Sequence, residues 1–221
     1  MKLKKIASLM LAGVMAVSML AGCNSASNGG NSGEGEGEGE GTTASGYSAM
    51  LGEKANELLT KNDLKDVYTF ADNADDQKEL EKQAVLVSDK EIRQAVVNNA
   101  LGKFTFNDDT AVKSAFDLDR YGLVDQNGNF VSSIAGLTQK VGEIWIANGD
   151  ISMDYVMNEI YESCKNAFVT SPKDGQVNGI NAECGYTVSV SVVNKTLKSY
   201  NDFSGSVNII LVTVTQKAEL V

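Results

Sequence analysis

Side chains that could bind a metal ion through oxygen atoms cluster in DLDRYGLVDQNGN, residues 117–129. Asp125, Asn127 and Asn129 are spaced two apart, which matches the first ligands of a twelve-residue calcium loop. The rest of that pattern is missing, because glycine stands at the fourth loop position rather than the sixth and Gly136 replaces the final glutamate. The triplet is a calcium candidate, and turn formation is the simpler explanation of the same residues.

Histidine is absent from the whole sequence. This excludes Ser-His-Asp and Cys-His catalysis, histidine-ligated zinc and a histidine pH switch. The phosphate-binding patterns GxxxxGK[ST] and GxGxxG are also absent, and no SxxK supports a serine–lysine dyad. Carboxylate pairs such as Glu159 with Glu162 are expected by chance in an acidic chain. We therefore predict no catalytic residues, no metal and no cofactor, and the sequence favours a protein that is not an enzyme.

Trp145 is the only tryptophan, and it falls in VGEIWIA, residues 141–147. In a strand, Glu143, Trp145 and Ala147 would share one face. A tryptophan beside a carboxylate on an open face can bind a sugar or a peptide, so Glu143 and Trp145 are a candidate ligand platform. The alternative is a tryptophan that fills the space between the sheet and a helix.

Cys23 stands between an uncharged apolar run and a segment without large apolar side chains. Lys2, Lys4 and Lys5 precede 17 uncharged residues, 6–22, which is typical of an export signal that is removed. A retained membrane helix is the alternative, since this length is at the lower limit for spanning a bilayer. The small residues before Cys23 favour cleavage.

The quartet Leu20-Ala21-Gly22-Cys23 resembles the lipobox of bacterial lipoproteins and matches its consensus at every position. This resemblance implies that a diacylglycerol is attached to the Cys23 sulfur, that the chain is cut before Cys23, and that it stays on the extracytoplasmic side of the cell membrane. Two acyl chains hold a protein firmly in a bilayer. The Gly/Ser spacer looks most like that of Gram-positive lipoproteins. The rest of the chain resembles no family.

The chain therefore divides into a signal peptide (1–22), a lipidated cysteine with a linker (23–46) and one domain (47–221). The linker carries Gly, Ser, Asn and Glu, cannot bury enough surface to order itself, and should span about 25 Å. Removing the three signal lysines leaves 16 basic and 29 acidic residues, a net charge of −13. Such a chain repels phosphate, so we expect no nucleic-acid partner and membrane contact through the lipid only.

Cys164 and Cys184 remain once Cys23 is lipidated, and they are a candidate disulfide. Exported proteins meet oxidising conditions, and a bridge would close a loop of about 20 residues, contributing roughly 3 kcal/mol. The alternative is two separate buried thiols.

Apolar periodicity predicts the elements that position these residues. Helices are expected over about 47–61, 74–86, 88–101, 109–118 and 152–169, the third opening on the capping box Ser88-Asp-Lys-Glu91. Strands are expected over about 65–70, 103–106, 141–147, 186–193 and 207–215, with a hairpin turn at Asn127-Gly128. The last strand is apolar at both parities and should be covered on both faces. A loop over 194–206 would join the last two strands as an antiparallel pair. Together they predict an α+β domain, with helices packed on an antiparallel sheet formed mainly by the C-terminal half.

Three functions fit these features. The first is a non-enzymatic lipoprotein that binds an envelope protein or polymer. The second is a small hydrolase, or its accessory subunit, that uses carboxylates. The third is a solute receptor of a transporter, for which the domain is short. A deep cleft with converging carboxylates would favour the hydrolase, a flat aromatic patch would favour the first function, and a hinge between two lobes would favour the receptor.

Overall fold

The computed structural model describes residues 46–98, 100–106, 109–134, 136–200 and 203–221, all within one unit of the chain, Glu40–Val221. The helices in these ranges are α1 (Tyr47–Lys61), α2 (Ala74–Leu86), α3 (Asp89–Asn98), α4 (Asp109–Phe116), α5 (Met153–Cys164) and α6 (Ala167–Thr170). The strands are β1 (Tyr68–Phe70), β2 (Leu101–Lys103), β3 (Arg120–Tyr121), β4 (Thr138–Asn148), β5 (Asp174–Val177), β6 (Ile180–Tyr200) and β7 (Phe203–Leu220).

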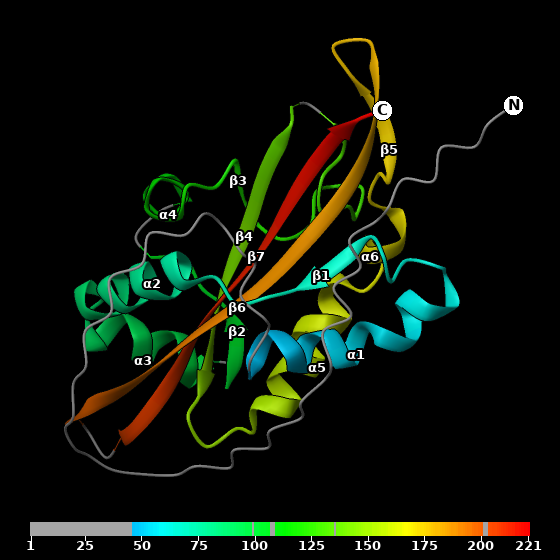
Figure 1. The fold of residues 1–221 in the computed structure, drawn as a ribbon. Helices are drawn as coiled ribbons and strands as arrows, with labels where there is room; N and C mark the ends of the chain where they lie inside the picture. The colour runs from blue at the N-terminus through cyan, green and yellow to red at the C-terminus, as the bar shows by residue number, and fades with distance from the viewer. Residues whose placement is uncertain (1–45, 99, 107–108, 135, 201–202) are drawn as a thin grey trace, which may run out of the picture. The chain divides into compact units, whose positions relative to one another are not determined.

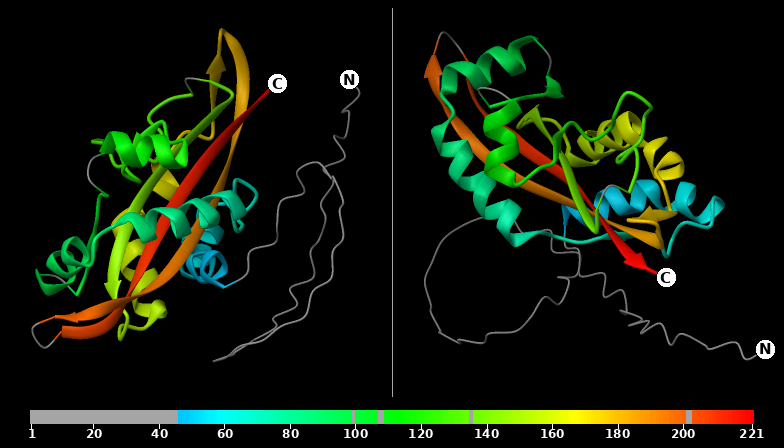
Figure 2. Two further views of the ribbon diagram at one scale, coloured as in Figure 1. Left: turned by 90° about the vertical axis from the view of Figure 1, so that its left-hand side faces the viewer. Right: turned by 90° about the horizontal axis from the view of Figure 1, so that it is seen from above.

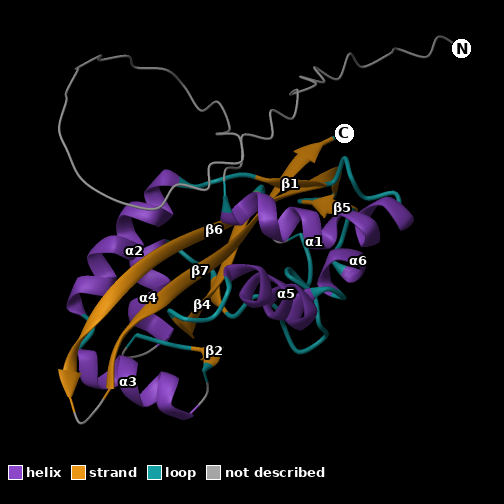
Figure 3. Ribbon diagram, turned by 90° about the horizontal axis from the view of Figure 1, so that it is seen from below, coloured by secondary structure: helices purple, strands orange, loops and turns teal. Residues whose placement is uncertain are grey.

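The strands form one sheet with helices on both faces. The strand order is β1-β6-β7-β4-β2, with β3 beside β4 and β5 beside β6. β1 and β3 run parallel to their neighbours, and the other pairs are antiparallel. Helices α1, α5 and α6 lie on one face, and α2, α3 and α4 on the other (Figures 1 to 3). The predicted α+β class and the C-terminal position of the main strands are confirmed.

Each helical layer covers its own hydrophobic core. Successive residues of β7 point to opposite faces. Ile210 and Val212 therefore join the core under α1, α5 and α6, whereas Ile209 and Leu211 join the core under α2, α3 and α4. All four side chains are fully buried. This confirms that the apolar run over 207–215 is covered on both faces.

Capping side chains fix where α2 and α3 begin. The Asn73 side-chain oxygen accepts hydrogen bonds from the backbone N–H groups of Asp75 and Asp76, both at 3.1 Å. At the predicted capping box, the Glu91 N–H donates to the Ser88 hydroxyl (3.3 Å), and the Ser88 N–H donates to the Glu91 carboxylate (3.2 Å). The ends of α1 and α2 are those that the sequence predicts.

The helix predicted over 152–169 is bent rather than continuous. α5 ends at Cys164 and α6 begins at Ala167, but Lys165 and Asn166 keep right-handed helical φ and ψ angles between them. The backbone therefore turns without leaving the helical region.

Side chains cover the edge of β6 where no strand pairs with it. The Gln77 amide donates to the Val192 carbonyl and accepts from the Val192 N–H, both at 3.1 Å. The Ser48 hydroxyl accepts from the Val190 N–H at 3.0 Å. These bonds imitate a neighbouring strand and protect the edge from pairing with another chain.

The prediction of a loop over 194–206 is wrong, because β6 and β7 continue through most of this range as an antiparallel pair. Tertiary contacts hold its polar residues in the strands. The Asn194 amide donates to Asn208 Oδ1 at 2.9 Å. The Lys195 ammonium donates to two backbone carbonyls at the end of α2, at 2.9 and 2.6 Å.

Two other predictions of turns and ends need correction. Asn127-Gly128 forms a turn, but no strand flanks it in the described part of the chain. An Asn-Gly hairpin does occur at Asn178-Gly179 between β5 and β6, where φ angles of 52° and 80° match a type I′ turn. The helix predicted over about 88–101 is shorter, because α3 ends at Asn98 and Leu101 already belongs to β2, in which Gly102 lies opposite Ile146 of β4.

Candidate functional site

Glu143 and Trp145 share one face of β4, but that face is covered by helices. Their exposed fractions are only 5% and 7%. Lys103 Nζ lies 2.9 Å from Glu143 Oε1 and 5.3 Å from the centre of the Trp145 ring. The candidate ligand platform is therefore not an exposed surface. Trp145 fills the space between the sheet and the helices, and Lys103 compensates the buried charge of Glu143.

In the calcium candidate, the Asp125 side chain is used to stabilise a turn. Asp125 Oδ1 accepts hydrogen bonds from the backbone N–H groups of Asn127 (2.8 Å) and Asn129 (2.9 Å), and its other oxygen accepts from the Ser132 hydroxyl. These donors, Ser132 first, lower the pKa of the Asp125 carboxyl. No group of three metal-binding His, Cys, Asp or Glu side chains occurs in the described residues.

The candidate disulfide is not formed, since Cys164 and Cys184 are both free and buried. The Cys164 thiol donates instead to the Ile160 carbonyl of its own helix at 3.2 Å. The two cysteines belong to one hydrophobic core, as the alternative of separate buried thiols requires.

We expect both thiols to react with iodoacetamide only after unfolding. Burial raises the pKa of the Cys164 thiol to about 12 and also raises that of Cys184, which disfavours the reactive thiolate at both positions. Mass spectrometry of the Cys23→Ser chain, alkylated in denaturant without reduction, should show two adducts. A product without adducts would mean that the bridge exists.

Cys23 and the proposed signal peptide and linker lie outside the described residues, except for Gly46. Among the described residues, no helix has both the length and the apolar character needed to span a membrane.

A buried ion pair that the sequence does not reveal links α2 to the sheet. Lys140 Nζ lies 2.6 Å from Asp76 Oδ1 and donates to the Phe116 carbonyl at 2.9 Å. The Thr213 hydroxyl donates to Asp76 Oδ2 at 2.9 Å. A cavity of about 400 Å³ lies beside the pair. Its charges largely compensate one another, as between Lys140 and Asp76 or between Lys82 and Glu79, so we assign this cluster to stability.

The sheet face that carries α2, α3 and α4 is uncovered at one end. On this face of β7, Ile209 and Leu211 are buried under the helices, whereas Lys217 and Glu219 are exposed. The polar residues of neighbouring strands extend the exposed surface. We call this surface the sheet end and define it by Asp66, Thr69, Asp174, Glu183, Thr187, Lys217 and Glu219.

The sheet end contains a cavity of about 340 Å³. Its walls come from β1, the turn before it, β6 and β7, and Gly185 exposes backbone in its lining. Three carboxylates line it, from Asp66, Glu183 and Glu219, against the single ammonium of Lys217. The cavity is therefore acidic and open to solvent.

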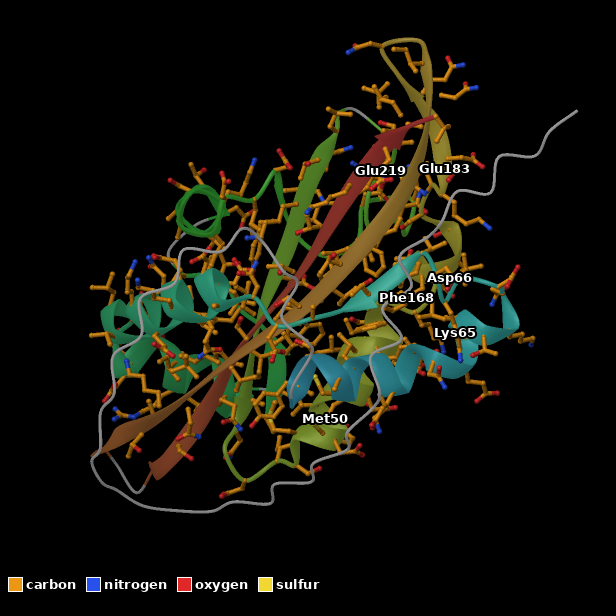
Figure 4. The ribbon with its side chains drawn as sticks, viewed as in Figure 1. Met50, Lys65, Asp66, Phe168, Glu183 and Glu219 are labelled. Carbon is orange, nitrogen blue, oxygen red and sulfur yellow. The ribbon has the colours of Figure 1, made fainter. Side chains whose placement is uncertain are left out.

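The carboxylates of the sheet end stand side by side on adjacent strands. Glu183 of β6 lies opposite Glu219 of β7 and also opposite Asp174 of β5. Figure 4 shows Glu183 and Glu219 close together where β6 begins and β7 ends. None of the three forms an ion pair or a side-chain hydrogen bond with the other described residues. The sequence alone does not bring them together, because their contact depends on strand register.

Comparison with known proteins gives no relative. No protein-family model matches the chain, and no match was found among curated proteins or solved structures. Its function therefore has to be argued from the residues.

Proposed function

We propose that this chain is a lipoprotein held on the extracytoplasmic side of the cell membrane, and that its domain is a non-enzymatic binding module for another envelope component. The anchor is supported by the basic start, the apolar run and the quartet Leu20-Ala21-Gly22-Cys23. The binding role is supported by one structural observation, the uncovered and unpaired charged surface of the sheet end.

The geometry favours binding over hydrolysis. Two carboxylates act as general acid and general base only when burial or neighbours give them different environments. Glu183 and Glu219 instead share one solvent-exposed face. A solute receptor encloses its ligand between two lobes. The described strands of this chain instead form one sheet, on which the described helices pack. An open surface suits a macromolecular partner better than a small enclosed substrate.

The anchor and the surface would act together. A linker that spans about 25 Å would keep the domain close to the membrane. The net negative charge of the chain without its signal peptide would keep the domain away from anionic lipid headgroups. The sheet end can therefore meet partners in the layer next to the membrane.

We expect the Cys23→Ser substitution to move the protein from the membrane fraction to the soluble or culture fraction, because two acyl chains supply the membrane affinity. In cross-linked cells, wild-type protein should recover an envelope component that the released variant recovers less efficiently. The Ser25→Ala variant, which keeps the quartet, is the control. Retention of the Cys23→Ser protein in the membrane would contradict the lipid anchor, and recovery of no cross-linked component would contradict the binding role.

A further inference from the structure

We propose that the sheet end binds an extended, positively charged segment of a partner protein. This inference rests on the proposed binding function and specifies the chemistry of the partner. The unpartnered sheet face, its charge and the exposed apolar residues on its reverse side support it as follows.

The row of carboxylates is unfavourable for the isolated domain. Adjacent strands are about 4.8 Å apart, and like charges directly opposite each other destabilise a sheet. The chain nevertheless places Asp174, Glu183 and Glu219 in one row. The buried carboxylate of Asp76 has a partner in Lys140, whereas the exposed carboxylates of this row form no ion pair with the other described residues. Like charges that face each other without a compensating ion pair are typical of a functional surface. A positively charged ligand would replace their repulsion with attraction.

The spacing suits several separate charges. Asp174 and Glu219 are two strand spacings apart, about 10 Å, and the described residues contain no group of three acidic, cysteine or histidine side chains placed to hold one metal ion. In an extended peptide, side chains that point the same way recur about every 7 Å. Lysine or arginine side chains are long and flexible, so two of them at alternate positions could reach the outer carboxylates of the row, Asp174 and Glu219.

Exposed apolar residues on the reverse side of the sheet end favour a protein over a polyamine. Ile180, Leu220 and Val221 lie at the same end of the sheet and are 49%, 48% and 67% exposed. Ile180 and Leu220 alternate with Glu183 and Glu219 along their strands, so they face the opposite side. Protein interfaces combine exposed apolar residues with a polar rim. A partner that wraps the sheet end can contact both sets, whereas a polyamine can contact only the carboxylates.

The test measures binding of a labelled peptide to the purified full chain. The probe is fluorescein-labelled Lys-Thr-Lys-Thr-Lys-Thr, followed by fluorescence anisotropy, with Glu-Thr-Glu-Thr-Glu-Thr as the reference peptide. The test variant is Glu183→Gln/Glu219→Gln, which removes two charges at nearly constant volume. The matched control is Glu53→Gln/Glu57→Gln, which makes the same charge change on exposed positions of α1. Thermal melting confirms that both variants fold.

We expect the lysine peptide to bind the wild type and the control equally, and to bind the test variant about fivefold more weakly. Binding should weaken between about 0.05 and 0.5 M salt. Equal binding to wild type and test variant, or no binding by the wild type up to about 1 mM peptide, would overturn the proposal. Displacement of the peptide by spermidine at equal charge concentration would overturn the preference for a protein segment. If the peptide fails while cells still yield a cross-linked partner, the proposed function stands and this inference falls.

Discussion

Replacement of Lys140 by methionine should lower the free energy of unfolding by about 3 kcal/mol. The substitution removes the partner of Asp76, whose side chain is only 4% exposed. The Thr213 hydroxyl would still donate to one oxygen of Asp76, but the negative charge would be left without a positive one in a poorly solvated place. The Lys140 side chain is 19% exposed, so we expect a loss at the lower end of the range for broken buried pairs.

Urea unfolding of the wild type and three variants tests this expectation. Lys165→Met is the matched control, because Lys165 pairs with Glu162 on the surface, and it should change stability by less than about 0.5 kcal/mol. Asp76→Asn/Lys140→Met should be more stable than Lys140→Met alone, since no buried charge remains. If Lys140→Met were as stable as Lys165→Met, the buried pair would contribute nothing.

Elements with strong local signals could be predicted from the sequence. α1 and α2 have the predicted ends because their apolar stripes lie within the segments themselves, and Asn73 next to α2 supplies its N-terminal cap. The capping box at Ser88 and Glu91 likewise depends on residues three apart. These features need no information from distant parts of the chain.

Elements that depend on tertiary contacts could not be predicted. Asn194 and Lys195 interrupt an apolar pattern, and only their bonds to Asn208 and to the end of α2 show why the strand continues through them. At Asn127-Gly128 the turn chemistry was predicted, but the absence of flanking strands in the described residues depends on long-range packing. The Asn-Gly turn at Asn178-Gly179 carried the same signal and could have been found.

The candidate site could likewise be predicted only where it depends on local sequence pattern. The pairing of Glu143 with Trp145 on one face followed from the period of a strand, but their burial depends on which helices cover β4. The carboxylates of the sheet end come from positions far apart in the sequence, such as Asp66, Glu183 and Glu219. Strand order and register bring them together, and neither can be read from one sequence by local pattern.

Replacement of Phe168 by alanine should lower the free energy of unfolding by about 4 kcal/mol. Phe168 is 1% exposed, and its ring meets those of Phe130 at 5.0 Å and Tyr68 at 5.1 Å, both edge to face. The substitution leaves a cavity and removes these ring contacts, which add to the lost burial. α6 has only four residues, too few to be stable by itself, so its place under the sheet depends on Phe168.

The comparison with Val169→Ala isolates this effect. Val169 follows Phe168 in α6 but is exposed, so its truncation should cost less than about 0.5 kcal/mol. Phe168→Leu should lie between the two, because leucine fills part of the cavity without the ring contacts. Urea unfolding should give the same slope for all variants, so that a shift in midpoint reports stability alone. A Phe168→Ala protein within about 1 kcal/mol of the wild type would show that this core relaxes around the loss and that the aromatic contacts do not hold α6 in place.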